Sequence, residues 1–239
     1  MIKPTDDRKT QAYRGQKNTF GLLPGDPRCG GTCPGATFGP GGCRESLSGR
    51  VTPVCYVERI LALRPAVCRV LAHNTRLLLD TTYDQRLALF LQEFLRFYSL
   101  EKRKKRTTDL RYRLHWSGDI PDEEYACALR EAIEACPFIQ FWGYTRSFFS
   151  VPILAGLKNL AWYLSLDSCN FDEGWKVYQK HKDAGNIHIA LMAKNNRKLP
   201  DGTRLVACPV DEGKKALELA CFSCRQCFSG KSIFFRTRS

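Results

Sequence analysis

The sequence predicts an α/β protein built as a partial (β/α) barrel of about five to six parallel strands, with a cysteine-rich, metal-binding N-terminal loop and a cysteine-rich C-terminal segment. Two observations carry this prediction. Short apolar runs alternate with helical stretches over the second half of the chain, and this alternation implies right-handed crossovers between parallel strands. In addition, four cysteines gather in residues 208–227.

The totals fit one large domain or two small ones. At 239 residues the chain is long enough to bury a hydrophobic core, and its 12 cysteines exceed what packing needs. The polar start predicts no secretory leader, so we expect a cytoplasmic protein. The longest apolar stretch, residues 138–157, contains Arg146 and is interrupted by Pro152, so it predicts no membrane span.

The first half of the chain predicts a loop and helices. Residues 21–53 are dominated by Gly, Pro, Ser and Thr, so they predict a long loop. Residues 56–80 are apolar at helical spacing, and Pro65 is expected to break or restart that helix. A further helix is expected over residues 83–104, where apolar side chains share one face.

The second half alternates strands and helices. The expected strands are 110–116, 138–144, 161–167, 186–194 and 203–209, with residues 18–22 considered as a sixth. The expected helices between them are 122–136, 151–160 and 172–184. Such short β-rich runs joined by amphipathic helices are typical of consecutive β-α-β units.

The expected organisation is one barrel domain with basic ends. The domain covers residues 29–228, including the cysteine loop 29–55 and the cysteine segment 208–227. A basic arm, residues 1–28, precedes it, and a basic tail, residues 229–239, follows it.

Polar residues follow the ends of the expected strands. The carboxyl ends of parallel strands meet at one edge, where α/β barrels carry their reacting groups. That edge is predicted to collect Ser117, Gly118, Asp119, Tyr144, Arg146, Asp167 and Cys208. The candidate catalytic residues among them are Asp119, Tyr144, Arg146 and Asp167. The alternative is that polar residues mark strand ends in any fold.

The C-terminal cysteines form a complete four-thiolate set, Cys208, Cys221, Cys224 and Cys227. Two-residue spacing lets the chain turn around a soft metal centre. A run of three such cysteines is more typical of iron–sulfur ligation than of structural zinc, which favours separated pairs. A 4Fe-4S cluster, zinc and the absence of any metal all stay open at this point.

A second and looser cysteine set, Cys29, Cys33, Cys43 and Cys55, lies in the N-terminal loop. A long loop with little apolar content needs an internal tie, and in a reducing compartment a metal site is a more common tie than a disulfide. The two sets together predict one or two 4Fe-4S clusters, with zinc as the alternative. The other cysteines, Cys68, Cys127, Cys136 and Cys169, are expected to be buried apolar residues.

The positive charge is regional. Residues 1–28, 101–113, 194–204 and 225–239 carry +3, +5, +3 and +4, so the rest of this +13 chain is slightly acidic. Clustered charge of this kind favours a nucleic acid or a nucleoprotein as partner. Aromatic residues interleaved with the cations in RYRLHW and SIFFRTRS would stack on bases. The alternative is a solubilising surface.

Five segments are distinctive in combination: TCPGATFGPGGCRESLSGRVTPVCY, LHWSGDI, FWGYTRSF, YLSLD and CPVD…CFSCRQCF. In this order they resemble the signature segments of the phage-encoded gene product 88 family, over roughly residues 32–228. Members of that family look like divergent radical S-adenosylmethionine proteins. The resemblance implies a phage protein in the cytoplasm of the infected host cell.

The resemblance also implies a cofactor site. In radical S-adenosylmethionine enzymes three cysteines hold a 4Fe-4S cluster and leave one iron for the cofactor; the counterparts here are Cys33, Cys43 and Cys55. Their spacing is much wider than in the enzymes, and Cys29 as a fourth ligand would close the open iron. The segment Ser117, Gly118 and Asp119 resembles the motif that holds the cofactor's amino group.

Three functions are consistent with these features. The preferred hypothesis is an iron–sulfur protein that has lost cofactor cleavage and binds nucleic acid or a host nucleoprotein partner through its basic segments. The first alternative is an active radical S-adenosylmethionine enzyme. The second is a zinc-stabilised scaffold protein.

Overall fold

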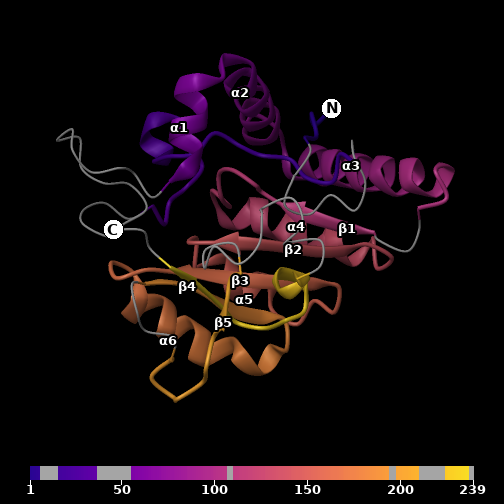
Figure 1. The fold of residues 1–239 in the computed structure, drawn as a ribbon. Helices are drawn as coiled ribbons and strands as arrows, with labels where there is room; N and C mark the ends of the chain where they lie inside the picture. Colours follow the sequence, from indigo (N-terminus) through magenta and orange to yellow (C-terminus); the bar gives the residue numbers. More distant parts are fainter. Residues whose placement is uncertain (6–15, 37–54, 107–109, 194–197, 210–223, 237–239) are drawn as a thin grey trace.

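The computed structural model describes residues 1–5, 16–36, 55–106, 110–193, 198–209 and 224–236 (Figure 1). At its centre is a six-stranded, all-parallel sheet in the order β1-β2-β3-β4-β6-β5. The predicted α/β class and parallel sheet are confirmed. A barrel is not confirmed, because the sheet is open, with β1 (Arg111–Leu114) at one edge and β5 (Val206–Ala207) at the other.

The predicted alternation is present from β1 to β4. The other strands of this run are β2 (Gln140–Thr145), β3 (Leu160–Leu166) and β4 (Ile187–Ala193). The helices between them are α4 (Glu123–Glu134), α5 (Ser150–Leu154) and α6 (Phe171–His181), with the short turn η2 (Lys182–Ala184) after α6. Each boundary lies within a few residues of the sequence prediction, except that α5 is shorter.

The last interior strand comes from the segment expected to be a basic tail. Strand β6 (Ile233–Arg236) lies between β4 and β5, so the predicted final strand, β5, is an edge strand. Ile233 and Phe234 are both about 1% exposed, because alternate residues of β6 face opposite sides of the sheet. The sequence did not predict this strand, because basic residues surround the short apolar run, although the strand is buried on both faces.

The N-terminal arm runs alongside β1. The amides of Arg113 and Trp116 donate to the carbonyls of Asn18 and Phe20, at 2.9 and 3.1 Å, and the amide of Leu22 donates back to the β1 end. The segment considered as a sixth strand therefore lies parallel to β1, although it makes only a single bridge there. It covers much of the outer edge of β1.

Three α-helices precede the sheet within the described residues. They are α1 (Tyr56–Leu63), α2 (Pro65–Leu79) and α3 (Tyr83–Arg103). Pro65 takes the first position of α2, as predicted, since proline has no amide hydrogen to lose there. Helix α3 starts at a capping box between Thr82 and Gln85. No helix within the described ranges is long and apolar enough to span a membrane.

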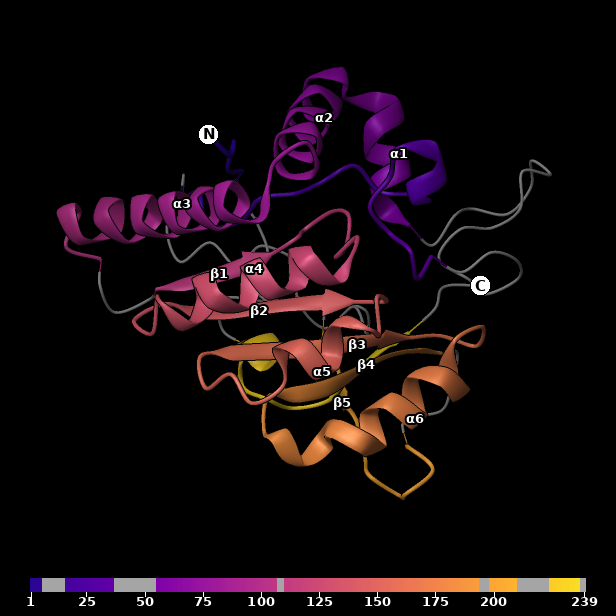
Figure 2. The same cartoon turned by 180° about the vertical axis from the view of Figure 1, so that it is seen from behind.

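The two faces of the sheet have different covers. Helices α4, α5 and α6 lie on one face, and the C-terminal segment with the short turn η3 (Gln226–Phe228) lies on the other (Figures 1 and 2). We call the first the helix face and the second the aromatic face. Residues of the helix face, such as Tyr112, Phe141 and Trp162, join one large core.

Candidate functional site

The carboxyl ends of the first strands meet at Asp119, as the strand-end rule predicts. Asp119 follows β1 and is only 5% exposed. Its Oδ1 accepts hydrogen bonds from the Ile120 amide and the Thr145 hydroxyl, both at 2.8 Å. Its Oδ2 accepts from the amides of Arg146 and Ser147, at 2.6 and 3.2 Å. Burial raises the pKa of Asp119, while these donors act in the opposite direction. The carboxylate therefore ties the end of β1 to the end of β2.

We call the edge where the carboxyl ends of the strands meet the rim. Arg146 links the end of β2 to the end of β3 along this rim. Its guanidinium lies 2.5 Å from Oδ2 of Asp167, and both side chains are largely buried. The other oxygen of Asp167 accepts from the Cys169 amide at 2.8 Å. The structure thus brings Asp119, Arg146 and Asp167 together at one edge of the sheet. Their assignment as catalytic residues stays a prediction.

The residues expected to hold a cofactor are engaged with the N-terminal segment. Ser117 donates to the Leu22 carbonyl at 2.8 Å, and the Asp119 amide donates to the Thr32 hydroxyl at 3.2 Å. Gly118 has a φ of 75°, and a Cβ there would lie 2.4 Å from the Thr32 hydroxyl oxygen. Only glycine fits this combination of backbone and contact. Cofactor binding by Ser117, Gly118 and Asp119 stays a prediction that this packing does not favour.

The start of the cysteine loop lies on the same rim. A Cβ at Gly35 would lie 1.9 Å from the Arg146 carbonyl oxygen, so the loop backbone is packed directly on the residue after β2. Cys33 lies between Gly35 and Thr32, which both touch the rim. Its amide donates to the Gly25 carbonyl at 2.8 Å. The loop therefore brings Cys33 to the edge that carries Asp119 and Arg146.

A second group of polar residues lies on the aromatic face. The Tyr144 hydroxyl donates to Sγ of Cys227 at 3.1 Å. Burial raises the pKa of the Cys227 thiol, and the neighbouring thiols of Cys208 and Cys224 raise it further. The Tyr144 hydrogen bond and the Arg113 charge lower it. Three of the four predicted C-terminal thiols thus lie near one another, beside the predicted site residue Tyr144.

Aromatic and cationic contacts hold η3 against the sheet. Trp142 meets Phe228 edge-on at 5.0 Å between centroids, and the Arg111 guanidinium lies 4.5 Å over the Phe228 ring. Arg113 lies 5.0 Å over Trp142. The Tyr163 hydroxyl donates to the Gln226 carbonyl at 3.2 Å. The sequence prediction missed these anchors, although strand alternation in RYRL, QFWGYT and LAWYLSL places Arg111, Arg113, Trp142 and Tyr163 on one face.

His188 is a further residue that the sequence prediction missed. Its ring lies 5.1 Å from that of Tyr163 on the aromatic face, and a Cβ at Gly230 would lie 3.2 Å from it. Burial lowers the pKa of His188 to about 4. The imidazole is therefore neutral at pH 7 and is packed beside the C-terminal segment.

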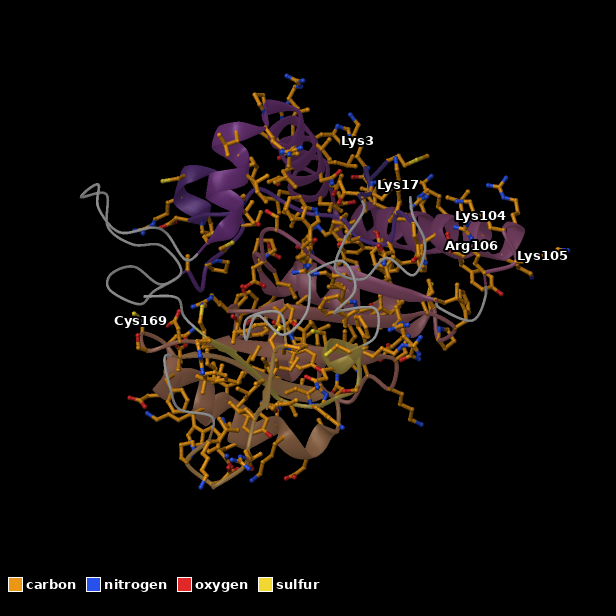
Figure 3. All side chains as sticks on the ribbon, in the orientation of Figure 1. Lys3, Lys17, Lys104, Lys105, Arg106 and Cys169 are labelled. Atoms are coloured by element: carbon orange, nitrogen blue, oxygen red, sulfur yellow. The ribbon has the colours of Figure 1, made fainter. Side chains whose placement is uncertain are left out.

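The remaining cysteines are dispersed. Cys29 is exposed at the end of η1 (Pro27–Cys29), and Cys33 and Cys55 are half-buried. Cys136 is buried as expected, and burial raises its pKa to about 11. Cys169, however, is exposed (Figure 3).

The two predicted ligand sets are not complete in the part of the chain that the structure describes. Cys43 and Cys221 lie outside it. Within it, no group of three or more His, Cys, Asp or Glu side chains has the arrangement of a metal site. Both metal sites therefore stay predictions.

These features define a class: an open parallel α/β protein with a polar rim at its strand ends and a thiol-bearing aromatic face. More particularly, the chain belongs to the gene product 88 family, whose sequence pattern matches residues 2–230. The predicted family is thereby confirmed.

Two phage proteins illustrate the family. The Gene 88 protein of Mycobacterium phage L5 is 31% identical over 259 residues, covering 99% of this chain and 98% of the relative. The Gene 88 protein of Mycobacterium phage D29 is 30% identical over 258 residues, with the same coverage. No solved structure matches. These comparisons do not show the resemblance to radical S-adenosylmethionine proteins.

Proposed function

We propose that this chain is a phage metal-thiolate protein that binds nucleic acid. Its metal centre, a 4Fe-4S cluster with zinc as the alternative, is bound by Cys208, Cys221, Cys224 and Cys227. The observation that carries the proposal is the position of Cys208 and Cys224 close enough to Cys227 to raise its pKa. Neighbouring half-buried thiols are the kind of ligand set that a soft cation binds as the thiols lose their protons.

The surroundings of Cys227 also fit a thiolate centre. Tyr144 offers a hydroxyl donor to its sulfur, and Arg113 supplies a positive charge nearby. Hydrogen-bond donors and charges beside cysteine ligands stabilise and tune such centres. When bound, a cluster would supply one-electron transfer or a structural tie for the C-terminal segment.

The incomplete ligand set is compatible with this proposal. A preformed metal site is uncommon without the metal, since binding draws the ligands together and is coupled to local folding. Cys221, in the same C-x2-C-x2-C run, supplies the fourth thiolate. The N-terminal set has weaker support: among its described members, Cys33 lies between Thr32 and Gly35, which contact the rim, and Cys29 is exposed.

The enzyme alternative receives no comparable support. The groups expected to hold S-adenosylmethionine, on Ser117 and Asp119, are used in hydrogen bonds within the protein. Nucleic-acid binding is supported by the net charge of +13 and its concentration in a few segments.

Metal analysis tests the proposal. The full chain, purified without oxygen, is assayed for iron, sulfide and zinc alongside Cys224→Ser and Cys227→Ser. Cys127→Ser is the matched control, since Cys127 is half-buried on α4. We expect about four irons and four sulfides per chain, or one zinc, in the wild type and the control. Metal that is absent from the wild type, or retained in both ligand variants, would refute the metal centre.

A further inference from the structure

The C-terminal end of α3 is an exposed cluster of positive charge. It carries five consecutive cations, Lys102, Arg103, Lys104, Lys105 and Arg106, and all but the half-buried Arg106 are exposed. We call these five residues the basic end. One or two cations at a helix C-terminus stabilise the helix dipole, but five exceed that need.

Few carboxylates offset this charge along the helix. The acidic residues between 85 and 106 are Glu93 and Glu101, and both are buried. Glu93 is held by two short hydrogen bonds from Arg96, and Glu101 accepts one from Gln16 at 3.3 Å. The negative charges are thus directed inward, whereas the lysines remain in solvent.

The N-terminal arm extends the same surface. Arg96 donates to the Lys17 carbonyl at 3.3 Å, which fixes Lys17 beside α3. Lys3, Lys17, Lys104, Lys105 and Arg106 lie along one side of the molecule (Figure 3). Segments far apart in the sequence therefore place cations on the same side of the molecule.

An aromatic pair adjoins the basic end. Phe138, which is 39% exposed, packs against Tyr98 of α3, with 4.3 Å between the ring centroids and an angle of 43° between the ring planes. Lys102 lies 5.8 Å over the Tyr98 ring. An exposed ring next to several cations is the combination that binds single-stranded nucleic acid, because bases stack on the ring while phosphates meet the cations. A duplex offers no unstacked base for such a ring.

We infer that the basic end of α3, extended by Lys17 and Lys3 and flanked by Phe138, binds single-stranded nucleic acid. This inference rests on the proposed nucleic-acid binding and specifies its surface and its ligand. The phosphate contacts supply affinity without sequence preference. The aromatic pair supplies the preference for single strands over duplex.

Fluorescence anisotropy with the full chain tests this inference. The probes are a labelled oligothymidine and a labelled duplex of equal length, each titrated between 50 and 200 mM salt. The triple variant Lys102→Gln, Lys104→Gln, Lys105→Gln should lose at least tenfold in affinity, and its salt slope should fall by about two. The control triple Lys176→Gln, Lys180→Gln, Lys182→Gln removes the same charge from α6 and η2, across the sheet from α3 (Figure 1), and should keep affinity within a few-fold.

Phe138→Ala separates stacking from charge. We expect about a tenfold loss on the single strand, little change on the duplex and an unchanged salt slope. Equal losses of affinity in the two lysine triples would refute the assignment of binding to the basic end, while the proposed nucleic-acid binding would stand. Tighter binding of the duplex, with Phe138→Ala neutral, would overturn the single-strand preference. A wild type that binds neither probe would overturn both this inference and the proposed nucleic-acid binding.

Discussion

The helix face of the sheet is lined by apolar carbon, whereas the aromatic face carries cations, hydroxyls and thiols. Alternate residues of the same strands make both faces. In β2, Phe141 joins the helix-face core, while Trp142 and Tyr144 point to the other side. In β3, Trp162 and Tyr163 divide in the same way, and both are fully buried. The pleat therefore places the large apolar core on one face and the polar and thiol groups on the other.

A parallel sheet has to be covered on both faces. On the helix face the crossover helices provide the cover, since β1, β2 and β3 are followed by α4, α5 and α6. On the aromatic face the C-terminal segment provides it, held by Trp142 and Tyr163. This second cover is short and contains Cys224 and Cys227. We therefore expect ligand binding on the aromatic face, where the C-terminal segment is a short cover. We expect the larger contribution to the free energy of unfolding from the helix face.

The largest expected effect is on the helix face. Trp162→Ala removes a fully buried ring from the large core, and we expect a loss of about 3 to 5 kcal/mol in the free energy of unfolding. Phe235→Ala removes a half-buried ring from the aromatic face and should cost less, about 1 to 2 kcal/mol. Urea denaturation measures both. Equal losses in the two variants would show that the two faces contribute alike to the free energy of unfolding, which would contradict the expected difference.

The rim is the next test. Asp119→Asn replaces one acceptor oxygen with an amide NH2 group that faces amide or hydroxyl donors, so we expect a loss of about 2 to 3 kcal/mol in the free energy of unfolding. Asp201→Asn is a suitable control, because Asp201 is exposed. Urea denaturation should leave that control near the wild type. A neutral Asp119→Asn would mean that the carboxylate is available for a ligand after all.

Acid should weaken the protein through its buried histidines. Burial lowers the pKa of His115 to about 3, and its Nε2 lies 2.7 Å from the Tyr125 hydroxyl oxygen. The unfolded chain then binds more protons between that value and about 6.5. The free energy of unfolding therefore falls as the pH drops through this window, by roughly 2 kcal/mol between pH 6.5 and 4.5.

His115→Asn tests the acid effect, since asparagine tolerates the φ of 51° found there. Its unfolding free energy should depend less on pH between 6.5 and 4.5 than that of the wild type. His188→Asn, on the aromatic face, should give a smaller change, because His188 is only partly buried. If the unfolding free energy of His115→Asn depends on pH more steeply than that of the wild type, the assignment of this acid effect to His115 is wrong.

The sequence predicted the run from β1 to β4 because alternating strands and helices leave a strong periodic signal. It also predicted the meeting of Asp119, Arg146 and Asp167, since strand ends must meet at one edge. It did not predict that both oxygens of Asp119 would accept hydrogen bonds within the protein, because two of the donors, the amides of Arg146 and Ser147, are placed by loop geometry after β2. The sequence did not predict strand β6, because a short apolar run among cations is also typical of a basic C-terminal tail.

The smallest expected effect tests the thiol side of the comparison. Tyr144→Phe removes the hydroxyl that donates to Cys227 and lowers its pKa, so the thiol should hold its proton more tightly. In metal-free protein at pH 8, alkylation of Cys227 followed by peptide mass spectrometry should slow by a few-fold, since the thiolate is the reactive form. Tyr163→Phe is the matched control, because that hydroxyl donates to the Gln226 carbonyl and not to sulfur. If Tyr163→Phe slows alkylation as much as Tyr144→Phe does, the Tyr144 hydrogen bond to sulfur does not govern the reactivity of Cys227.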